Sequence, residues 1–378
     1  MRIVIDALGN KHGGGVTVLL DLLYAASQLG DIKETIILAS PAAVRGFDIP
    51  PYANLRVVDV AAAETTSGRL WWAAMGLTRF LRTLDCDIVL GLNGFGGLDR
   101  TVASVVFIQQ SIPYSAESMR RFPWAMRMRM NVIRWLTRRS AVRADHVLVQ
   151  SESMRTMIAD AFHISLERIS AFMPTAPVLS RATAPSPKLQ VLRSDTPPGA
   201  MLYVGNDSSH KNLEVVAQGL LQIAPAQRPK WYVTLPASSL VCREGAAVSL
   251  GSLDRSELRE AYQHATFLVM PSLTETVGLP MLEAMRVGTP VLAADRPYAH
   301  AVCEGAAVLF DPLSPSDFAQ KASRLCADVS WRNELADKGR ALIKRRDELN
   351  PYRAMIEKVV LVARQVREQR GKGDRVSS

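Results

Sequence analysis

Two glutamates set eight positions apart, Glu275 and Glu283, are the residues whose type and spacing point most directly to chemistry. A carboxylate has two oxygens, so each glutamate can accept hydrogen bonds from both hydroxyls of a diol. One glutamate could hold a ribose and the other a sugar, with a diphosphate between them on backbone amides. The alternative is that both glutamates only favour the start of a helix, where acidic side chains complement the helix dipole. We prefer the binding role for the whole stretch that contains them.

The elements around these glutamates are expected to place them near a helix start. Apolar runs at residues 266–270 and 291–294 predict two buried strands. Pro280 suits the first turn of a helix because it has no N–H to leave unpaired, and Gly288 falls where that helix should end. The free N–H groups and the dipole at such a helix start attract anions. The stretch therefore predicts strand, loop, helix and strand around an anion-binding site.

This stretch resembles the E-x7-E signature of retaining glycosyltransferases with the GT-B fold, in particular glycosyltransferase family four. The resemblance runs through residues 262–290 and includes Pro271, Ser272, Glu275, Gly278, Leu279, Pro280, Glu283, Ala284, Gly288, Thr289 and Pro290. It implies an α/β GT-B fold with two Rossmann-like domains whose parallel sheets face each other across a cleft. It also implies that Glu275 contacts donor-sugar hydroxyls and that Glu283 holds the ribose. The other loop residues expected to bind the donor are Thr276, Val277, Gly278 and Leu279.

Lys211 is expected to supply positive charge to the same site. It lies between a predicted strand at residues 200–204 and a predicted helix at 212–223, where a lysine is well placed to meet a phosphate. The alternative is a solvated surface lysine. In the resembling family a basic pair precedes this helix, and Lys211 matches its phosphate-binding lysine. Asn206 stands where many members carry arginine, so the resemblance implies that phosphate binding is weaker or shared with His210. The catalytic residues expected are thus Glu275 and Lys211.

Two further loops are expected to face the substrates. Gly14 and Gly15 belong to a run of three glycines after the first strand, where backbone can approach a ligand closely. The resembling family has a glycine-rich loop here that faces the donor phosphates, whereas the alternative is an ordinary flexible loop. Asn93 and Gly94 follow a strand at its carboxyl end, where open α/β sheets bind ligands, so we assign them to the acceptor side. Gln110 joins them, and it stands near the point where many family members place a histidine.

No metal and no cofactor are expected besides the nucleotide diphosphate sugar as donor substrate. The Asp85-Cys86-Asp87 string has the D-x-D form that metal-dependent glycosyltransferases use. Its two aspartates alternate at the start of a predicted strand, so they should point to opposite faces. The four cysteines include no C-x-x-C pair, which argues against a zinc site.

A basic helix bearing tryptophan is expected within a long helical region at residues 116–140. The chain has 378 residues and a formal net charge of +9, and eight arginines with no acid between Arg120 and Arg143 could account for nearly all of it. One helical face carries Arg127, Arg134 and Arg138, and the neighbouring face carries Trp124, Met128, Val132 and Trp135. Tryptophan and arginine together suit the interface of a membrane with anionic lipid. The alternative is a core-facing helix with a solvated basic side.

The length of the chain predicts two domains. Alternating strands and helices over residues 1–173 predict a parallel sheet covered on both faces. Residues 174–198 contain six prolines and are the expected linker. Residues 199–350 repeat the pattern as the nucleotide-sugar domain. A last helix is expected at 351–370, which in the resembling family crosses back to the first domain, followed by a frayed tail at 371–378.

These features predict a metal-independent, retaining glycosyltransferase that moves a sugar from a nucleotide diphosphate sugar to an acceptor hydroxyl. By resemblance, the acceptor would be a lipid-linked glycan in bacterial surface polysaccharide or lipopolysaccharide assembly. No apolar run could span a membrane and the start is no secretory signal, so we expect a cytoplasmic enzyme, peripheral on the inner face of the cytoplasmic membrane. Two alternatives stay open: a GT-B nucleotide-sugar epimerase, and a basic nucleic-acid- or membrane-binding protein without catalysis. Nucleic acid is not an expected partner, because no nucleic-acid motif accompanies the charge.

Overall fold

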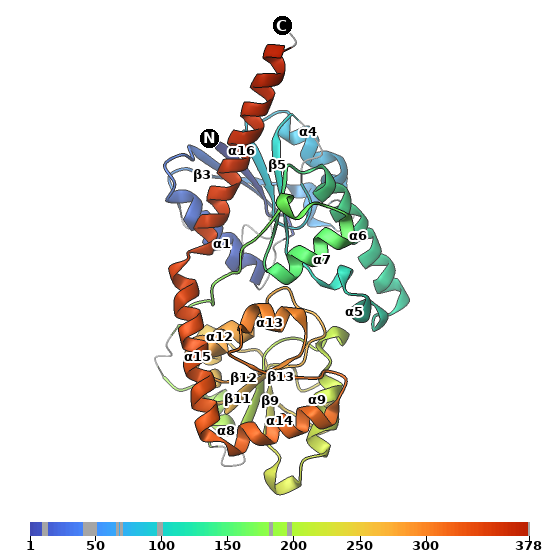
Figure 1. Ribbon diagram of the computed structural model, residues 1–378, viewed down its shortest axis with the longest axis vertical. Coiled ribbons are helices and arrows are strands. Elements are labelled where there is room, and N and C mark those ends of the chain that lie inside the picture. The colour runs from blue at the N-terminus through green and yellow to red at the C-terminus, as the bar shows by residue number, and fades with distance from the viewer. Residues whose placement is uncertain are drawn as a thin grey trace. The chain divides into compact units, whose positions relative to one another are not determined.

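The computed structural model describes residues 1–9, 14–40, 51–65, 68, 71–96, 101–180, 184–194 and 199–376. The chain divides into two compact units, each built on its own parallel sheet (Figure 1). The first unit comprises Met1–Tyr114, Trp124–Pro174 and Asn350–Ser378. The second comprises Ser115–Pro123 and Thr175–Leu349. Two parallel sheets with accompanying helices confirm the predicted α/β class.

Seven parallel strands form the sheet of the first unit, in the order β3-β2-β1-β4-β5-β6-β7. In that order their bounds are Leu55–Asp59, Glu34–Ala39, Arg2–Asp6, Ile88–Gly91, Ala103–Ile108, His146–Val149 and Ile169–Ala171. The central strands are apolar runs buried on both faces, which is typical of a parallel sheet covered by helices on both sides. Because the strands are parallel, their carboxyl ends meet at one edge of the sheet and their amino ends at the other.

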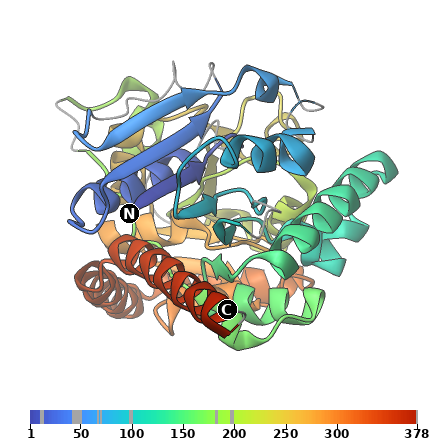
Figure 2. The same ribbon diagram turned by 90° about the horizontal axis from the view of Figure 1, so that it is seen from above.

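Helices α1 (Gly14–Ser27) and α16 (Pro351–Val376) lie side by side on one face of this sheet (Figures 1 and 2). The opposite face is covered by a π-helical turn at Trp72–Gly76, by α4 (Leu77–Leu81) and by α7 (Glu152–Phe162). The end of the chain thus packs on the first unit. Helix α16 reaches beyond the predicted helix end at residue 370, so the expected frayed tail is helical up to its last described residue.

Six parallel strands form the sheet of the second unit, in the order β10-β9-β8-β11-β12-β13. In that order their bounds are Val248–Ser249, Lys230–Val233, Ala200–Tyr203, Phe267–Met270, Val291–Ala294 and Val308–Phe310. The helices of this unit are α5 (Ala116–Arg120), α8 (Gln190–Arg193), α9 (Leu213–Leu221), α10 (Leu240–Arg243), α11 (Arg255–His264), α12 (Leu279–Val287), α13 (Pro297–Cys303), α14 (Pro315–Ala327) and α15 (Val329–Glu348). Helices α9 and α14 pack together on the sheet, and α12 packs against α11 and α15.

The described residues of the predicted linker at 174–198 include some that pack against the second unit. Leu189 and Leu192 are buried in the second unit. The Ser186 hydroxyl donates to Glu257 at 2.8 Å, and the Ser186 N–H donates to Glu260 at 3.1 Å. Prolines interrupt regular structure here, but these contacts with α11 attach the segment to the domain that follows it.

The long helix predicted at 116–140 is two helices. Helix α5 belongs to the second unit, whereas α6 (Trp124–Arg143) belongs to the first. Pro123 separates them, since proline has no N–H for a helical hydrogen bond and its ring disfavours continuation from the preceding turn. The Ser115 hydroxyl caps α5 by accepting from Ser118 N at 3.2 Å. The chain therefore enters the second unit at Ser115 and leaves it again after Pro123.

Candidate active site

The turn between β11 and α12 places Glu275 before a helix start and Glu283 after it. Helix α12 begins directly after Gly278, whose φ of +76° is left-handed. A side chain there would be strained, and its Cβ would lie 2.8 Å from Met281 Cε. Gly278 offers no side chain to cap the helix. Pro280 has no N–H, and the Met281 N–H donates to the Gly278 carbonyl at 2.9 Å, so of the first three residues of α12 only Leu279 has an N–H without a hydrogen-bond partner among the described residues. The helix ends at Gly288, and the predicted order of strand, loop, helix and strand is confirmed.

Glu275 forms an ion pair with Lys211, with 2.5 Å between Oε1 and Nζ. Only 12% of the lysine side chain and 14% of the glutamate side chain are exposed, so Lys211 is not a solvated surface lysine. The Leu273 N–H donates to the His210 carbonyl at 2.8 Å and joins the two loops. Desolvation makes a buried ion pair a poor source of stability, so the pair points to a functional role. An ammonium has three N–H donors, and two remain for a ligand oxygen.

His210 lies beside this pair as a buried, neutral imidazole. Its pKa is lowered to about 4, mainly by burial and then by the positive charge of Lys211, while Glu275 acts in the opposite direction. His210 Nδ1 is buried and has no hydrogen-bond partner among the residues that the structure describes. Buried polar atoms are usually hydrogen-bonded, so an unpaired ring nitrogen next to Lys211 indicates a place where a ligand or water can bind.

Glu283 lies in a different environment from Glu275. Its side chain is buried, and Oε2 accepts a hydrogen bond from the Tyr262 hydroxyl at 2.8 Å. Burial raises the pKa of Glu283, whereas the hydrogen bond from Tyr262 and the charge of Arg255 lower it. The Thr289 hydroxyl holds the Tyr262 carbonyl at 2.7 Å, which fixes the end of α11 against α12. Tyr262 and Thr289 lie in the stretch at residues 262–290, but their residue types alone did not predict that they position Glu283.

The side chains of Asn206 and Val277, both predicted to bind the donor, are not available to a ligand in the way expected. Asn206 is exposed, and its Oδ1 accepts from Ser208 N at 3.1 Å, so it shapes the loop before Lys211. Val277 is buried and can offer a ligand only its backbone. Thr276 is half-buried beside it.

A small pocket of about 190 Å³ lies in the first unit, at the carboxyl edge of its sheet. Four residues singled out in the sequence line it: Gly15, Asn93, Gly94 and Gln110. Asn93 Nδ2 is buried there without a hydrogen-bond partner in the described part of the chain. Gly14 begins α1 next to Gly15, and Gly13 lies outside the described residues. The pocket is thus lined by glycine backbone and by the unpaired side-chain amide of Asn93. It lies at the carboxyl edge of the sheet, where open α/β sheets bind ligands.

Residues 199–328, which include Lys211, Glu275 and Glu283, match the family described as glycosyl transferases group 1. The match covers this part of the chain, and the residues before 199 and after 328 lie outside it. The match falls on the second unit and covers the two loops joined by the Leu273–His210 hydrogen bond.

Two curated proteins similar to this chain are described as glycosyltransferases. The O-antigen chain mannosyltransferase RfbU of Salmonella typhimurium is 27% identical over 187 residues, which cover 47% of this chain and 50% of the relative. A D-inositol 3-phosphate glycosyltransferase of Thermobifida fusca is 28% identical over 219 residues, which cover 52% of this chain and 50% of the relative. The chain spans about half the length of these curated relatives.

Solved structures similar to this chain establish its fold. WaaG, described as a glycosyltransferase involved in lipopolysaccharide biosynthesis, aligns with a TM-score of 0.71 at 15% identity, over 95% of this chain and 99% of WaaG. HepE of Anabaena, in complex with UDP and glucose, aligns with a TM-score of 0.64 at 17% identity, over 98% of this chain and 100% of HepE. The predicted GT-B fold is confirmed.

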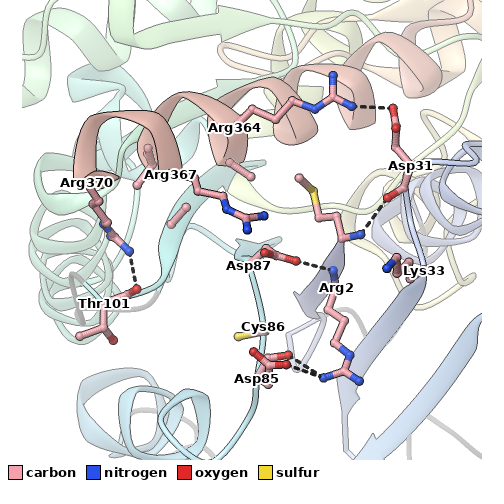
Figure 3. A pocket seen from close by; sticks show the side chains of 14 residues that line it. Arg2, Asp31, Lys33, Asp85, Cys86, Asp87, Thr101, Arg364, Arg367 and Arg370 are labelled. Carbon is pink, nitrogen blue, oxygen red and sulfur yellow. Dashed lines mark hydrogen bonds and ion pairs between the residues drawn. The ribbon is translucent and has the colours of Figure 1, made fainter. Parts of the chain in front are cut away.

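The Asp85-Cys86-Asp87 string is not arranged as predicted. Residues two apart in a strand point to the same face, so the expectation of opposite faces was wrong, and β4 itself begins only at Ile88. Both line one recess of the first unit, shown in Figure 3, instead of pointing to opposite faces. The Arg2 guanidinium contacts Asp85 at 2.9 Å, and the Arg2 N–H donates to Asp87 at 2.7 Å. Within the described residues, no group of three His, Cys, Asp or Glu side chains could hold a metal ion.

Helix α6 exposes both of its predicted faces. Trp124 is 71% exposed and Trp135 is 58% exposed, and Arg127, Arg134 and Arg138 are exposed as well. The buried residues of α6 are Thr137, Ser140 and Ala141. The helix is therefore anchored near its end and does not face a core over most of its length. In the described part of the chain, no helix combines the length and apolar character needed to cross a bilayer.

The segment Ser115–Pro123, which we call the arm, contacts the loop that carries Lys211. The Phe122 ring lies 6.0 Å from the His210 ring, centroid to centroid. At the other side of the arm, Glu117 pairs with Arg296 at 2.8 Å. Arg121 also forms an ion pair with Glu214, in the first turn of α9. The sequence did not predict that the arm contacts the Lys211 loop. Ser115 and Pro123 mark the two ends of the arm.

Replacing Phe122 by alanine is expected to weaken nucleoside diphosphate binding about 3- to 10-fold, because the ring contact that positions His210 beside Lys211 is lost. Phe122→Tyr keeps the ring and should bind as the native protein does. Isothermal titration calorimetry of both variants measures the difference. Equal affinity of the alanine and tyrosine variants would show that the arm does not position the loop.

Proposed function

We propose that this protein is a retaining glycosyltransferase that moves a sugar from a nucleotide diphosphate sugar to an acceptor hydroxyl. The observation that carries the proposal is the largely buried Lys211–Glu275 pair, which lies in the loops before α9 and α12. A cation and the positive end of a helix suit a diphosphate, and a carboxylate in the same place suits the hydroxyls of a sugar. Glu283 lies in the same helix, next to Tyr262, and would hold the ribose.

In the proposed transfer, the bond between the sugar's anomeric carbon and the diphosphate breaks while a bond to the acceptor oxygen forms on the same face. The acceptor proton passes to the departing phosphate, so no protein base is required. Negative charge develops on the leaving diphosphate, and Lys211 with the α12 amides would stabilise it. His210 would add a hydrogen bond from its neutral ring. Because these groups supply the positive charge, we propose that the transfer needs no metal ion and no cofactor.

The acceptor we propose is a lipid-linked glycan of bacterial lipopolysaccharide or surface polysaccharide. Support comes from the relatives: RfbU and mannosyltransferase B of Escherichia coli are both described as O-antigen chain mannosyltransferases, and WaaG is described as involved in lipopolysaccharide biosynthesis. The pocket lined by Asn93, Gly94 and Gln110 would receive the acceptor. The unpaired Asn93 amide there could orient one of its hydroxyls.

We further propose that the protein works as a peripheral protein on the inner, cytoplasmic face of the cytoplasmic membrane, with α6 as the contact. The support is the exposure of Trp124 and Trp135 on a helix that also exposes Arg127, Arg134 and Arg138. Indole rings favour the headgroup region of a bilayer, and arginines are attracted to anionic lipid. Such a contact would bring the enzyme to a lipid-linked acceptor.

Separate substitutions of the two glutamates test the donor site. Glu283→Ala is expected to weaken nucleoside diphosphate binding about 10- to 100-fold, because a charged hydrogen-bond partner is lost. Glu275→Ala should chiefly lower the transfer rate, by about 100-fold, because the sugar and Lys211 lose their partner. A panel of nucleotide sugars, assayed with and without chelator, measures binding and turnover.

The exposed Glu244, outside this site, provides the matched control as Glu244→Ala. Unchanged kinetics in both site variants would remove the assignment, and loss of activity with chelator would contradict metal independence. Conversion of the donor to an epimer without acceptor would favour the epimerase alternative.

The membrane contact has its own test. Replacing Arg127, Arg134 and Arg138 together by alanine should weaken binding to vesicles with anionic lipid about 100-fold, since each basic residue contributes about 1 kcal/mol near such a surface. Vesicle sedimentation at several salt concentrations measures it. The matched control removes the same charge from exposed positions elsewhere: Arg243, Arg340 and Arg353. If both triple variants bind equally, α6 is not the contact.

A further inference from the structure

The first unit contains a second, larger recess that none of the sites above uses. Its volume is about 800 Å³, and it lies alongside α16 where β1 and β4 begin (Figure 3). The small pocket near Asn93 lies at the opposite, carboxyl edge of the same strands. Lys211 and Glu275 belong to the other unit. This recess is therefore lined by none of the residues that we place in the transfer reaction.

Positive side chains outnumber carboxylates around the recess. The positive ones are Arg2, Lys33, Arg364, Arg367 and Arg370, and the acidic ones are Asp31, Asp85 and Asp87. Arg364 is paired with Asp31 at 2.9 Å. Arg2 is paired with Asp85, also at 2.9 Å. These two pairs leave an excess of positive charge that faces the recess.

Lys33 and Arg367 carry that excess. Neither side chain has an ion-pair or hydrogen-bond partner among the residues that the structure describes. Figure 3 shows Arg367 extending from α16 into the recess, toward Asp87. A recess with two unpaired cations attracts an anion such as a phosphate, which can accept from both.

Asp87 restricts the kind of anion. Its Oδ2 accepts from the Arg2 N–H at 2.7 Å, and no hydrogen bond to its other oxygen is found within the described residues. A free carboxylate oxygen repels a bare phosphate but accepts hydrogen bonds from hydroxyls. A ligand that joins a phosphate to several hydroxyls would use the cations and the carboxylate at once.

We propose that this recess binds a phosphorylated sugar at a site separate from the donor and acceptor sites. The phosphate lies against Lys33 and Arg367, and the sugar hydroxyls donate to Asp87. Lys33 directly precedes β2, whereas Arg367 belongs to α16, so the ligand links the last helix to the sheet. It adds to the Arg364–Asp31 pair, which already joins α16 to the segment before β2. Binding therefore stabilises the docking of α16.

The test is calorimetric titration of the full chain with glucose 6-phosphate at low salt, alongside glucose and inorganic phosphate. We expect glucose 6-phosphate to bind at least tenfold more tightly than either fragment. The double variant Lys33→Ala, Arg367→Ala should lose at least tenfold in affinity, since a charge-assisted contact is worth that much. Arg353→Ala, which removes an arginine of α16 outside the recess, should bind normally. Asp87→Asn should reduce the preference for glucose 6-phosphate over phosphate.

Titration of Lys211→Ala and Asn93→Ala separates this site from the transfer site. Both variants should bind glucose 6-phosphate as tightly as the native chain does, whatever the transfer assays show. Loss of binding in either would place the ligand in the transfer site and overturn the proposal. Unchanged affinity in the Lys33→Ala, Arg367→Ala double variant would overturn it too, as would equal affinity for inorganic phosphate.

Discussion

The ion pair between Lys211 and Glu275 is the interaction on which the candidate site depends. It links the loop after β8 to the loop after β11, and the Leu273–His210 backbone hydrogen bond holds the two loops in register. Little water reaches the pair, so its charges act at close to full strength on whatever binds between them. The same burial keeps His210 neutral and leaves its Nδ1 unpaired. A site with a cation, a carboxylate and a neutral ring in contact is prepared for a ligand that carries both phosphates and hydroxyls.

The arm, which is distant in sequence from the site, contacts the loop that carries His210 and Lys211. Phe122 contacts His210, and helix α6 begins one residue after the arm ends. Phe122 and the exposed Trp124 at the start of α6 are therefore close in sequence, although they belong to different units.

The sequence was most informative where local rules decide the structure. Pro280 at the first turn and Gly288 at the end predicted α12, and Gly288 adopts the left-handed conformation that such a helix end favours. Prediction from sequence failed where contacts between distant residues determine the position of a segment. The proline-rich segment at 174–198 is attached through Ser186 to α11, and the arm is attached through ion pairs. The hydrophobic periodicity of the sequence does not reveal such long-range contacts. Asp85 and Asp87 were misplaced because residues two apart in a strand point to the same face, whereas the prediction set them on opposite faces.

A structure of the protein with a nucleotide diphosphate sugar bound is the most direct test of this account. We expect the diphosphate within hydrogen-bond distance of Lys211 Nζ and of the first amides of α12, the sugar hydroxyls at Glu275, and the ribose at Glu283. Donor density anywhere else, with the Lys211–Glu275 pair unchanged and unoccupied, would contradict it.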